Sequence, residues 1–493
     1  MTLRTQVFSA LRWTVGARLV SQVATWAMTL VVIRLLAPSD YGLLAMASVL
    51  IAFLAMLSDI GVGPALVQRE SVDDDHLRKG FGIVLLVHFG AALIVFAAAP
   101  LMAIFFDTPR LTAVMRVMAS QFVIVAFGVI PDALLQRNME FKKRSLLDLT
   151  VAVVGGAMTL TFAFAGYGVW ALVAGNLTMA LCRTIGLNLF HPSLQLPSFR
   201  FAGMGTLLRF GGNITLSGVL WFFFTQADVF IAGKWLGKEA LGAYSVAMHL
   251  ASLPNQRISA LINQVTFPAF SRMQGDRSRV AAASLLGIRI LSFVTFPVAW
   301  GISSIAPEIV GVILGSRWGA ATLPLRIIAL IMPMRMISTF VPNAVQGIGR
   351  ADVVLKNAVW SVAIMLPAFL AGAYFGGLRG LVLALLIGTL LSFFNNISRS
   401  ATALGLSIRD VLRAMGPATL VGAAMYLVVS LVHRWLATGM PRLADLLILI
   451  LVGAVTYAVA SWLGNRRGFS EILRVFGEFA NMKPRGDVAP KAG

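Results

Sequence analysis

Ionised and amide side chains lie inside long apolar segments of this sequence, where an ionised group is costly unless it has a partner or a function. Asp228 is enclosed in the segment WFFFTQADVFIAG, about two helical turns before Lys234. Asp148 lies in a second apolar segment. Asp228 is therefore a candidate for a substrate-binding or ion-coupling group, or for a structural partner of a nearby arginine. Asp148 is a candidate for an ion-coupling group.

A second set of candidates is cationic or carries an amide. Because a guanidinium binds phosphate oxygens in a bidentate manner and stays charged at physiological pH, arginines inside a membrane indicate a site for an anion. The segment ASLPNQRISALINQVTFPAF is too polar on one face for contact with lipid. Arginines near the end of a span can instead extend to the lipid head groups. The candidate cavity residues, besides Asp228, are Arg18, Arg257, Arg335, Asn255, Gln256, Asn263 and Gln264.

The sequence contains no motif typical of an enzyme. A glycine-rich phosphate loop ending in Lys-Ser or Lys-Thr is missing, and the five histidines are scattered singly. The one cysteine, Cys182, excludes an intrachain disulfide and a thiolate metal cluster. We expect no catalytic residues, no metal and no cofactor.

The segments that position these residues are predicted to be membrane-spanning helices. Hydrophobic residues make up 58% of the 493 residues and charged residues only 12%, about half the usual charged fraction of a soluble domain. The apolar runs are continuous, which favours helices over a β-barrel of alternating polarity. We predict an all-α polytopic membrane protein with about fourteen spans, at 9–35, 41–67, 80–106, 111–135, 145–166, 168–189, 208–234, 240–270, 281–303, 320–346, 354–375, 379–398, 411–433 and 443–464.

The basic residues predict the orientation of these spans. Cytoplasmic loops are rich in Lys and Arg, and the basic residues here fall on alternate connections and on both termini. We therefore expect both termini on the cytoplasmic side of the membrane. The net charge of +20 is explained by this topology and by contact with anionic lipids rather than by binding of nucleic acid. The connections predicted to face outward lie around Pro38, Asp107, Gly166, Lys238, Gly376 and Gly439.

An internal repeat predicts how the helices are grouped. The segment RLLAPSDYG at 34–42 matches KWLGKEALG at 234–242, and both copies lie on the same side of the membrane. Repeats in the same orientation indicate two similar bundles related by an axis along the membrane normal, which is a transporter architecture. We predict two six-helix lobes and an extra helix pair, with boundaries at 1–190 (N-terminal lobe), 191–207 (cytoplasmic linker), 208–402 (C-terminal lobe), 403–465 (extra helix pair) and 466–493 (cytoplasmic tail).

Four segments resemble the Wzx-like polysaccharide transporter family. They begin at IRLLAPSDYG, LLQRNMEFKKRSLLDL, ADVFIAGKWLG and GSRWGAATLPLRIIAL, and the resemblance extends to about Gly405. The family belongs to the superfamily of multidrug, oligosaccharidyl-lipid and polysaccharide exporters. The resemblance implies a flippase that moves undecaprenyl-diphosphate-linked oligosaccharide repeat units to the outer leaflet by alternating access, for exopolysaccharide, capsule or O-antigen (lipopolysaccharide) biosynthesis. The implied partners are this lipid-linked oligosaccharide, membrane lipids, and a polysaccharide polymerase or chain-length and export complex.

Other functions are open at this point. An ion-coupled drug or small-molecule antiporter of the same superfamily would need carboxylates to dominate its cavity. A membrane glycosyltransferase or polymerase would need a sizeable aqueous domain, and the longest internal loop, about 190–207, is short. A scaffold of a polysaccharide assembly complex would tolerate the loss of every cavity arginine.

Overall fold

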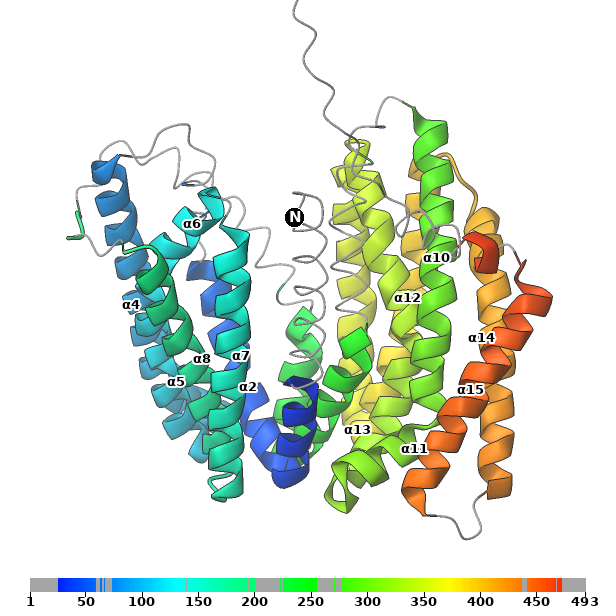
Figure 1. Cartoon of the computed structure of the whole chain (residues 1–493), viewed down its shortest axis with the longest axis horizontal. Coiled ribbons are helices and arrows are strands. Elements are labelled where there is room, and N and C mark those ends of the chain that lie inside the picture. Colours follow the sequence, from blue (N-terminus) through cyan, green and yellow to red (C-terminus); the bar gives the residue numbers. More distant parts are fainter. Residues whose placement is uncertain are drawn as a thin grey trace, which may run out of the picture. The chain divides into compact units, whose positions relative to one another are not determined.

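In the computed structural model, the described part of the chain is mostly helical, with short turns and connections between the helices (Figure 1). The described residues are 25–58, 63, 66, 73–138, 140–192, 196–199, 222, 225–254, 270, 273, 276–436, 441–466 and 468–471. Among them, nine helices are long and apolar enough to cross a membrane, or ten if the bent pair α5–α6 forms one span. The predicted all-α polytopic class is confirmed, whereas the count of fourteen stays a prediction.

The described helices belong to two compact units, and the first contains most of the N-terminal half. Unit 1 comprises Met1–Val246 together with Ile313–Ala321 and Leu366–Leu381. Buried apolar side chains such as Val32, Leu36 and Leu172 form part of its core. Its helices are Thr25–Leu35, α2 (Pro38–Ser58), α4 (Asp74–Phe105), α5 (Arg110–Ala126), α6 (Val129–Arg137), α7 (Phe141–Phe164), α8 (Val169–Phe190) and most of a helical segment at 225–254.

Unit 2 comprises Ala247–Val312, Thr322–Met365 and Val382–Gly493. Within it, α10 packs against α12 and α14, and α14 packs against α15. The side chains of Ile288, Phe296 and Ile337 are almost fully buried in its core. The elements that follow residue 276 are α10 (Arg277–Ser304), α11 (Ala306–Glu308), η1 (Ile309–Leu314), η2 (Ser316–Ala321), α12 (Thr322–Gly347), α13 (Ala351–Ala403), α14 (Ile408–Leu436) and α15 (Arg442–Gly464).

Breaks in the helices coincide with several predicted outward connections. Residues 225–254 form a continuous helical segment except that Gly237 has a φ of +79°, which separates the arms before and after it. The long helix α13 is likewise interrupted at Gly377. Asp107 and Gly166 lie in the short turns that follow α4 and α7. Each turn lies within a few residues of the place where the hydrophobic pattern predicts a connection.

Two of these turns share an unusual backbone conformation. Gly168 has φ of 57° and ψ of −129°, and Gly377 has φ of 55° and ψ of −139°. This region is essentially restricted to glycine because a Cβ atom would clash with the backbone. The residues that follow also match, as GVWALV at 168–173 and GLRGLV at 377–382. The two hairpins are thus a further pair of corresponding segments that the sequence comparison of the halves had missed.

The two compact units are not two consecutive halves of the sequence. The tip of α13, Leu366–Leu381, and the segment Ile313–Ala321 pack within unit 1, although they follow residue 246 in the sequence. The boundaries drawn at 190, 207, 402 and 465 follow the order of the predicted spans, and they stay a prediction of how the helices group into lobes.

Candidate functional site

Arg335 lies in the middle of the spanning helix α12 (Thr322–Gly347), about 20 Å from its start at 1.5 Å per residue. Its side chain is exposed, and its Nη1 atom lies 3.7 Å from the sulfur of Met248. In the described part of the chain no carboxylate forms an ion pair with it. A guanidinium at this depth needs water or an anionic ligand, because neither lipid tails nor a thioether can stabilise its charge.

Asp228 is held inside a helical hairpin. It lies before the break at Gly237, and its side chain is 9% exposed. The Tyr244 hydroxyl, from the arm after the break, donates a hydrogen bond of 2.5 Å to its Oδ2 atom, and the Val229 amide donates one of 2.9 Å to its Oδ1 atom. Asp228 therefore ties the two arms together through the Tyr244 hydroxyl. Its roles in substrate binding and ion coupling stay predictions.

Asp148 belongs to a network of charges on three helices of unit 1. Arg183 of α8 donates to Asp148 of α7 over 2.6 Å and to Asp132 of α6 over 3.5 Å. Arg144 of α7 lies 3.4 Å from Asp132. Asp148 is thus an ion-pair partner of Arg183, and a role in ion coupling would require this pair to open.

Sequence reasoning had not singled out Arg183 as an intramembrane charge. It lies within the predicted span 168–189, so its position alone could have identified it. Its partners could not have been found in this way, because Asp132 and Asp148 are distant in the sequence. Only the packing of α6, α7 and α8 brings the three groups together.

A buried amide network joins the two arms of α13. The Asn357 side chain donates a hydrogen bond of 3.0 Å to the Ser400 hydroxyl, and Asn396 donates one of 2.9 Å to the Ser361 hydroxyl. Asn357 and Ser400 are almost fully buried. These hydrogen bonds link the two arms of the hairpin within the membrane.

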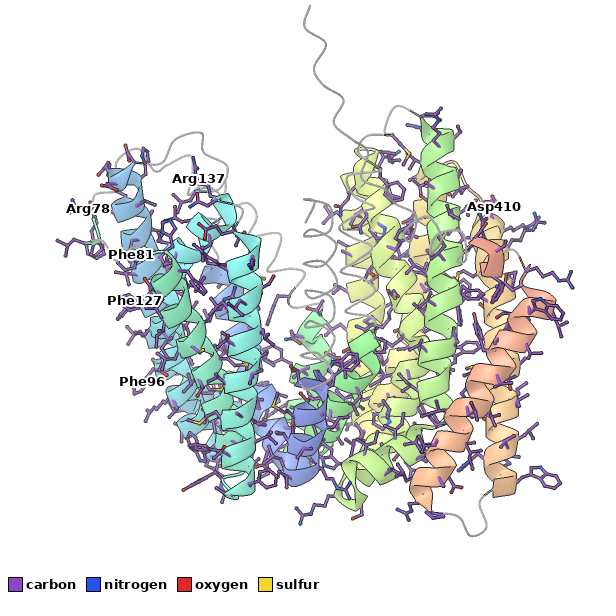
Figure 2. All side chains as sticks on the ribbon, in the orientation of Figure 1. Arg78, Phe81, Phe96, Phe127, Arg137 and Asp410 are labelled. Carbon is purple, nitrogen blue, oxygen red and sulfur yellow. The ribbon has the colours of Figure 1, made fainter. Side chains whose placement is uncertain are left out.

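The basic connections of unit 1 lie at one end of its helices. Figure 2 shows Arg78, near the start of α4, and Arg137, at the end of α6, at the same end. Arg78 Nε donates to the carbonyl of Leu196 over 3.1 Å, so the described part of the connection between α8 and the following segment lies there too. This arrangement agrees with the alternation of basic loops in the sequence and makes this end suited to anionic head groups.

The remaining candidate cavity residues lie outside the described residues. They are Arg18, Asn255, Gln256, Arg257, Asn263 and Gln264. Of the predicted cavity arginines, the structure therefore places Arg335 alone. In the described part of the chain no group of three or more His, Cys, Asp or Glu side chains is arranged to hold a metal ion.

Two known proteins are similar to this chain in sequence, and a solved structure is similar to it in fold. The lipopolysaccharide biosynthesis protein WzxC of Escherichia coli is 24% identical, with 80% of this chain and 81% of that protein covered. The succinoglycan biosynthesis transport protein ExoT of Rhizobium meliloti is 28% identical, with 74% of each chain covered. A solved structure of the lipid II flippase MurJ superposes with a TM-score of 0.73 at 14% identity, over 91% of this chain and 98% of that chain.

The sequence model of one protein family matches more than half of the chain. This family is described as polysaccharide biosynthesis protein, and residues 31–323 match it. The matched region includes both copies of the repeat and Asp228. The chain belongs to the polysaccharide biosynthesis protein family.

Proposed function

We propose that this protein is a flippase that moves undecaprenyl-diphosphate-linked oligosaccharide repeat units across the bacterial cytoplasmic membrane, for the synthesis of a cell-surface polysaccharide. The observation that carries the proposal is Arg335, an exposed guanidinium halfway along a spanning helix. An anionic passenger explains a cation at this depth. The relatives named as a succinoglycan transport protein and as a probable glycan biosynthesis flippase support the direction of the proposal.

A polar cavity would lower the free energy of moving this passenger through the membrane. Even one charge at the centre of a bilayer costs at least about 2.5–3.5 kcal/mol, and the passenger carries a diphosphate and several sugars. Arg335, with Arg18 and Arg257 as further candidates, supplies polar contacts that replace water around the diphosphate. The polyprenyl tail stays in the lipid while the cavity opens first to one face and then to the other.

The antiporter alternative finds less support in the described charges. Antiport of a cation requires carboxylates that are available to it. Asp132 and Asp148 are engaged by arginines, and Asp228 is engaged by Tyr244. Arg335, near the middle of the spanning helix α12, is exposed, has no ion pair with a described carboxylate, and is a cation.

The cellular setting is part of the same proposal. The protein lies in the inner membrane with both termini in the cytoplasm, and it passes its product to a polymerase or to a chain-length and export complex. Coupling to a proton or sodium gradient would use Asp228 or Asp148. No cofactor is needed for these steps.

Replacement of Arg335 tests the proposal. In Arg335→Ala cells, lipid-linked oligosaccharide should accumulate on the cytoplasmic leaflet and surface polysaccharide should fall at least tenfold at an equal amount of protein in the membrane. Arg335→Lys should keep part of the export, because the charge remains but the bidentate geometry is lost. Arg326→Ala is the matched control, since Arg326 lies near the start of the same helix and donates to the Tyr426 hydroxyl.

Two outcomes would contradict this proposal. Normal export by the Arg335→Ala variant would show that Arg335 does not bind the passenger. If deletion of the whole gene leaves the precursor and the surface polysaccharide unchanged, the protein is not a flippase for this pathway.

A further inference from the structure

Two glycines of the internal repeat lie in a reciprocal backbone contact. A Cβ atom added to Gly42 would lie 1.8 Å from the carbonyl oxygen of Lys238, and one added to Gly242 would lie 1.7 Å from the carbonyl oxygen of Pro38. Separations below 3.0 Å are essentially never seen for real Cβ atoms. Because the obstacle is backbone in both cases, a side-chain rotation cannot relieve it. Only glycine fits at either position.

The symmetry of the contact follows the repeat. Position 42 corresponds to 242 and position 38 to 238, so each copy places its glycine against the same carbonyl of the other copy. Gly42 lies near the start of α2, and Gly242 lies near the start of the arm that follows Gly237. Figure 1 shows α2 in blue beside the green segment 225–246, and both residues belong to unit 1.

Other predicted outward connections meet at the same end of unit 1. The ammonium group of Lys234 donates to the Phe105 carbonyl over 2.6 Å, next to the turn at Asp107. A Cβ atom on Gly168 would lie 2.9 Å from the Asp40 carboxylate. These contacts connect four turns that the charge pattern places on the outer side of the membrane.

A segment from later in the chain also packs against the first repeat copy. The indole nitrogen of Trp318 donates a hydrogen bond of 2.9 Å to the carbonyl of Ile33, and the Trp318 side chain is fully buried. Its ring also meets Tyr41 edge to face. Trp318 therefore covers the first copy beside the glycine contact.

We infer that Gly42 and Gly242 are positioning residues of an outer gate, and that their contact closes the transport path at its outward end. That this contact gates transport rests on the proposed function. In alternating access the two repeat copies move against each other, so a direct contact between them must open for the passenger to leave. The contact is small and is made by backbone atoms, so its closure depends on a fit that one methyl group would abolish.

Access of a thiol reagent from outside tests the gate without any passenger. Met46 lies four residues after Gly42, hence on the same face of α2, and is fully buried. Met46→Cys in a Cys182→Ser background provides one thiol behind the contact. In intact cells, Gly42→Ala and Gly242→Ala should each raise its labelling by a membrane-impermeant maleimide at least threefold.

The controls separate a gate from a general loosening of the helices. Gly90→Ala makes the same change in α4, where a Cβ atom would meet nothing within 4 Å, and labelling should stay at the parent level. The double variant Gly42→Ala/Gly242→Ala should label little more than either single variant, because both remove one shared contact. If the two substitutions raise the labelling independently, so that their factors multiply in the double variant, the two glycines do not act through one shared contact.

A milder variant keeps the test decisive if the alanine variants do not reach the membrane. Trp318→Phe removes one hydrogen bond without adding atoms to the contact, and it should raise the labelling of the thiol introduced by Met46→Cys by a smaller factor. The gate proposal is wrong if every variant that inserts into the membrane is labelled only at the parent level. It is also wrong if labelling rises only when the reagent reaches the cytoplasmic side. If the gate responds but export of lipid-linked oligosaccharide does not depend on the protein, only the proposed passenger is wrong.

Discussion

Charged side chains in this membrane protein fall into two groups by their partners. Asp132, Asp148 and Asp228 have hydrogen-bond donors within their own helix bundle. Arg335 has a thioether as its described neighbour. A charge that is satisfied inside the protein can be structural, whereas an exposed charge halfway across the membrane calls for a ligand or for water. This difference, rather than the mere presence of a charge in a span, selects Arg335.

The hydrogen bond between Tyr244 and Asp228 predicts that the Tyr244→Phe variant has a lower free energy of unfolding. The variant keeps the buried ring but removes the hydroxyl donor from a buried carboxylate, which typically costs about 1–3 kcal/mol. We expect a lower thermal unfolding midpoint of the purified protein in detergent. Tyr167→Phe is the control, because the Tyr167 side chain is 58% exposed. Equal midpoints for the two variants would show that the tie contributes no stability.

At the scale of the elements, the hairpins α7–α8 and α13 turn through the same backbone conformation. Gly168 and Gly377 both have positive φ and strongly negative ψ. The turn reverses the chain within a few residues and so places the second helix of each hairpin against the first. Because backbone sterics restrict this conformation to glycine, the two glycines determine how the four helices of these hairpins are arranged.

Gly377→Ala should destabilise the α13 hairpin. An alanine at φ of 55° and ψ of −139° costs about 1–3 kcal/mol in strain. We expect a lower thermal midpoint and less protein in the membrane. Gly376→Ala is the matched neighbour, because a Cβ atom there meets nothing within 4 Å and Gly376 is not among the glycines with positive φ. The strain argument fails if Gly376→Ala lowers the midpoint as much as Gly377→Ala does.

At the scale of the whole molecule, the basic connections predict how the chain lies in the membrane. Arg78 and Arg137 lie at one end of unit 1 (Figure 2), and the glycine contact joins the two copies of the repeat. If the positive-inside rule orients the chain, the end with Arg78 and Arg137 is cytoplasmic.

Reporter fusions check this orientation. Green fluorescent protein fused after Gly493 should fluoresce, because it folds in the cytoplasm, and alkaline phosphatase inserted after Gly376 should be active, because it needs the oxidising outer side. A reporter inserted after Gly405 provides the internal comparison and should behave like the one at the C-terminus. The reverse pattern of activities would show that the chain has the opposite orientation.

The sequence by itself determined the class of the protein, the positions of most helix breaks and the family. These properties depend on local patterns: continuous apolar runs, polar or glycine-containing breaks, and a repeated motif at 34–42 and 234–242. In a membrane, backbone hydrogen bonds must be satisfied within each segment, so an apolar run of sufficient length specifies a helix without knowledge of its neighbours.

Only the tertiary structure decided which side chains meet. The sequence listed Asp148, Asp228 and Arg335 together as charged candidates, and the packing separated the first two, which have partners, from the third. It also showed that each of the two matching glycines lies against a backbone carbonyl of the other repeat copy. These contacts join residues far apart in the chain, and because their distances depend on how the helices cross, no local pattern encodes them.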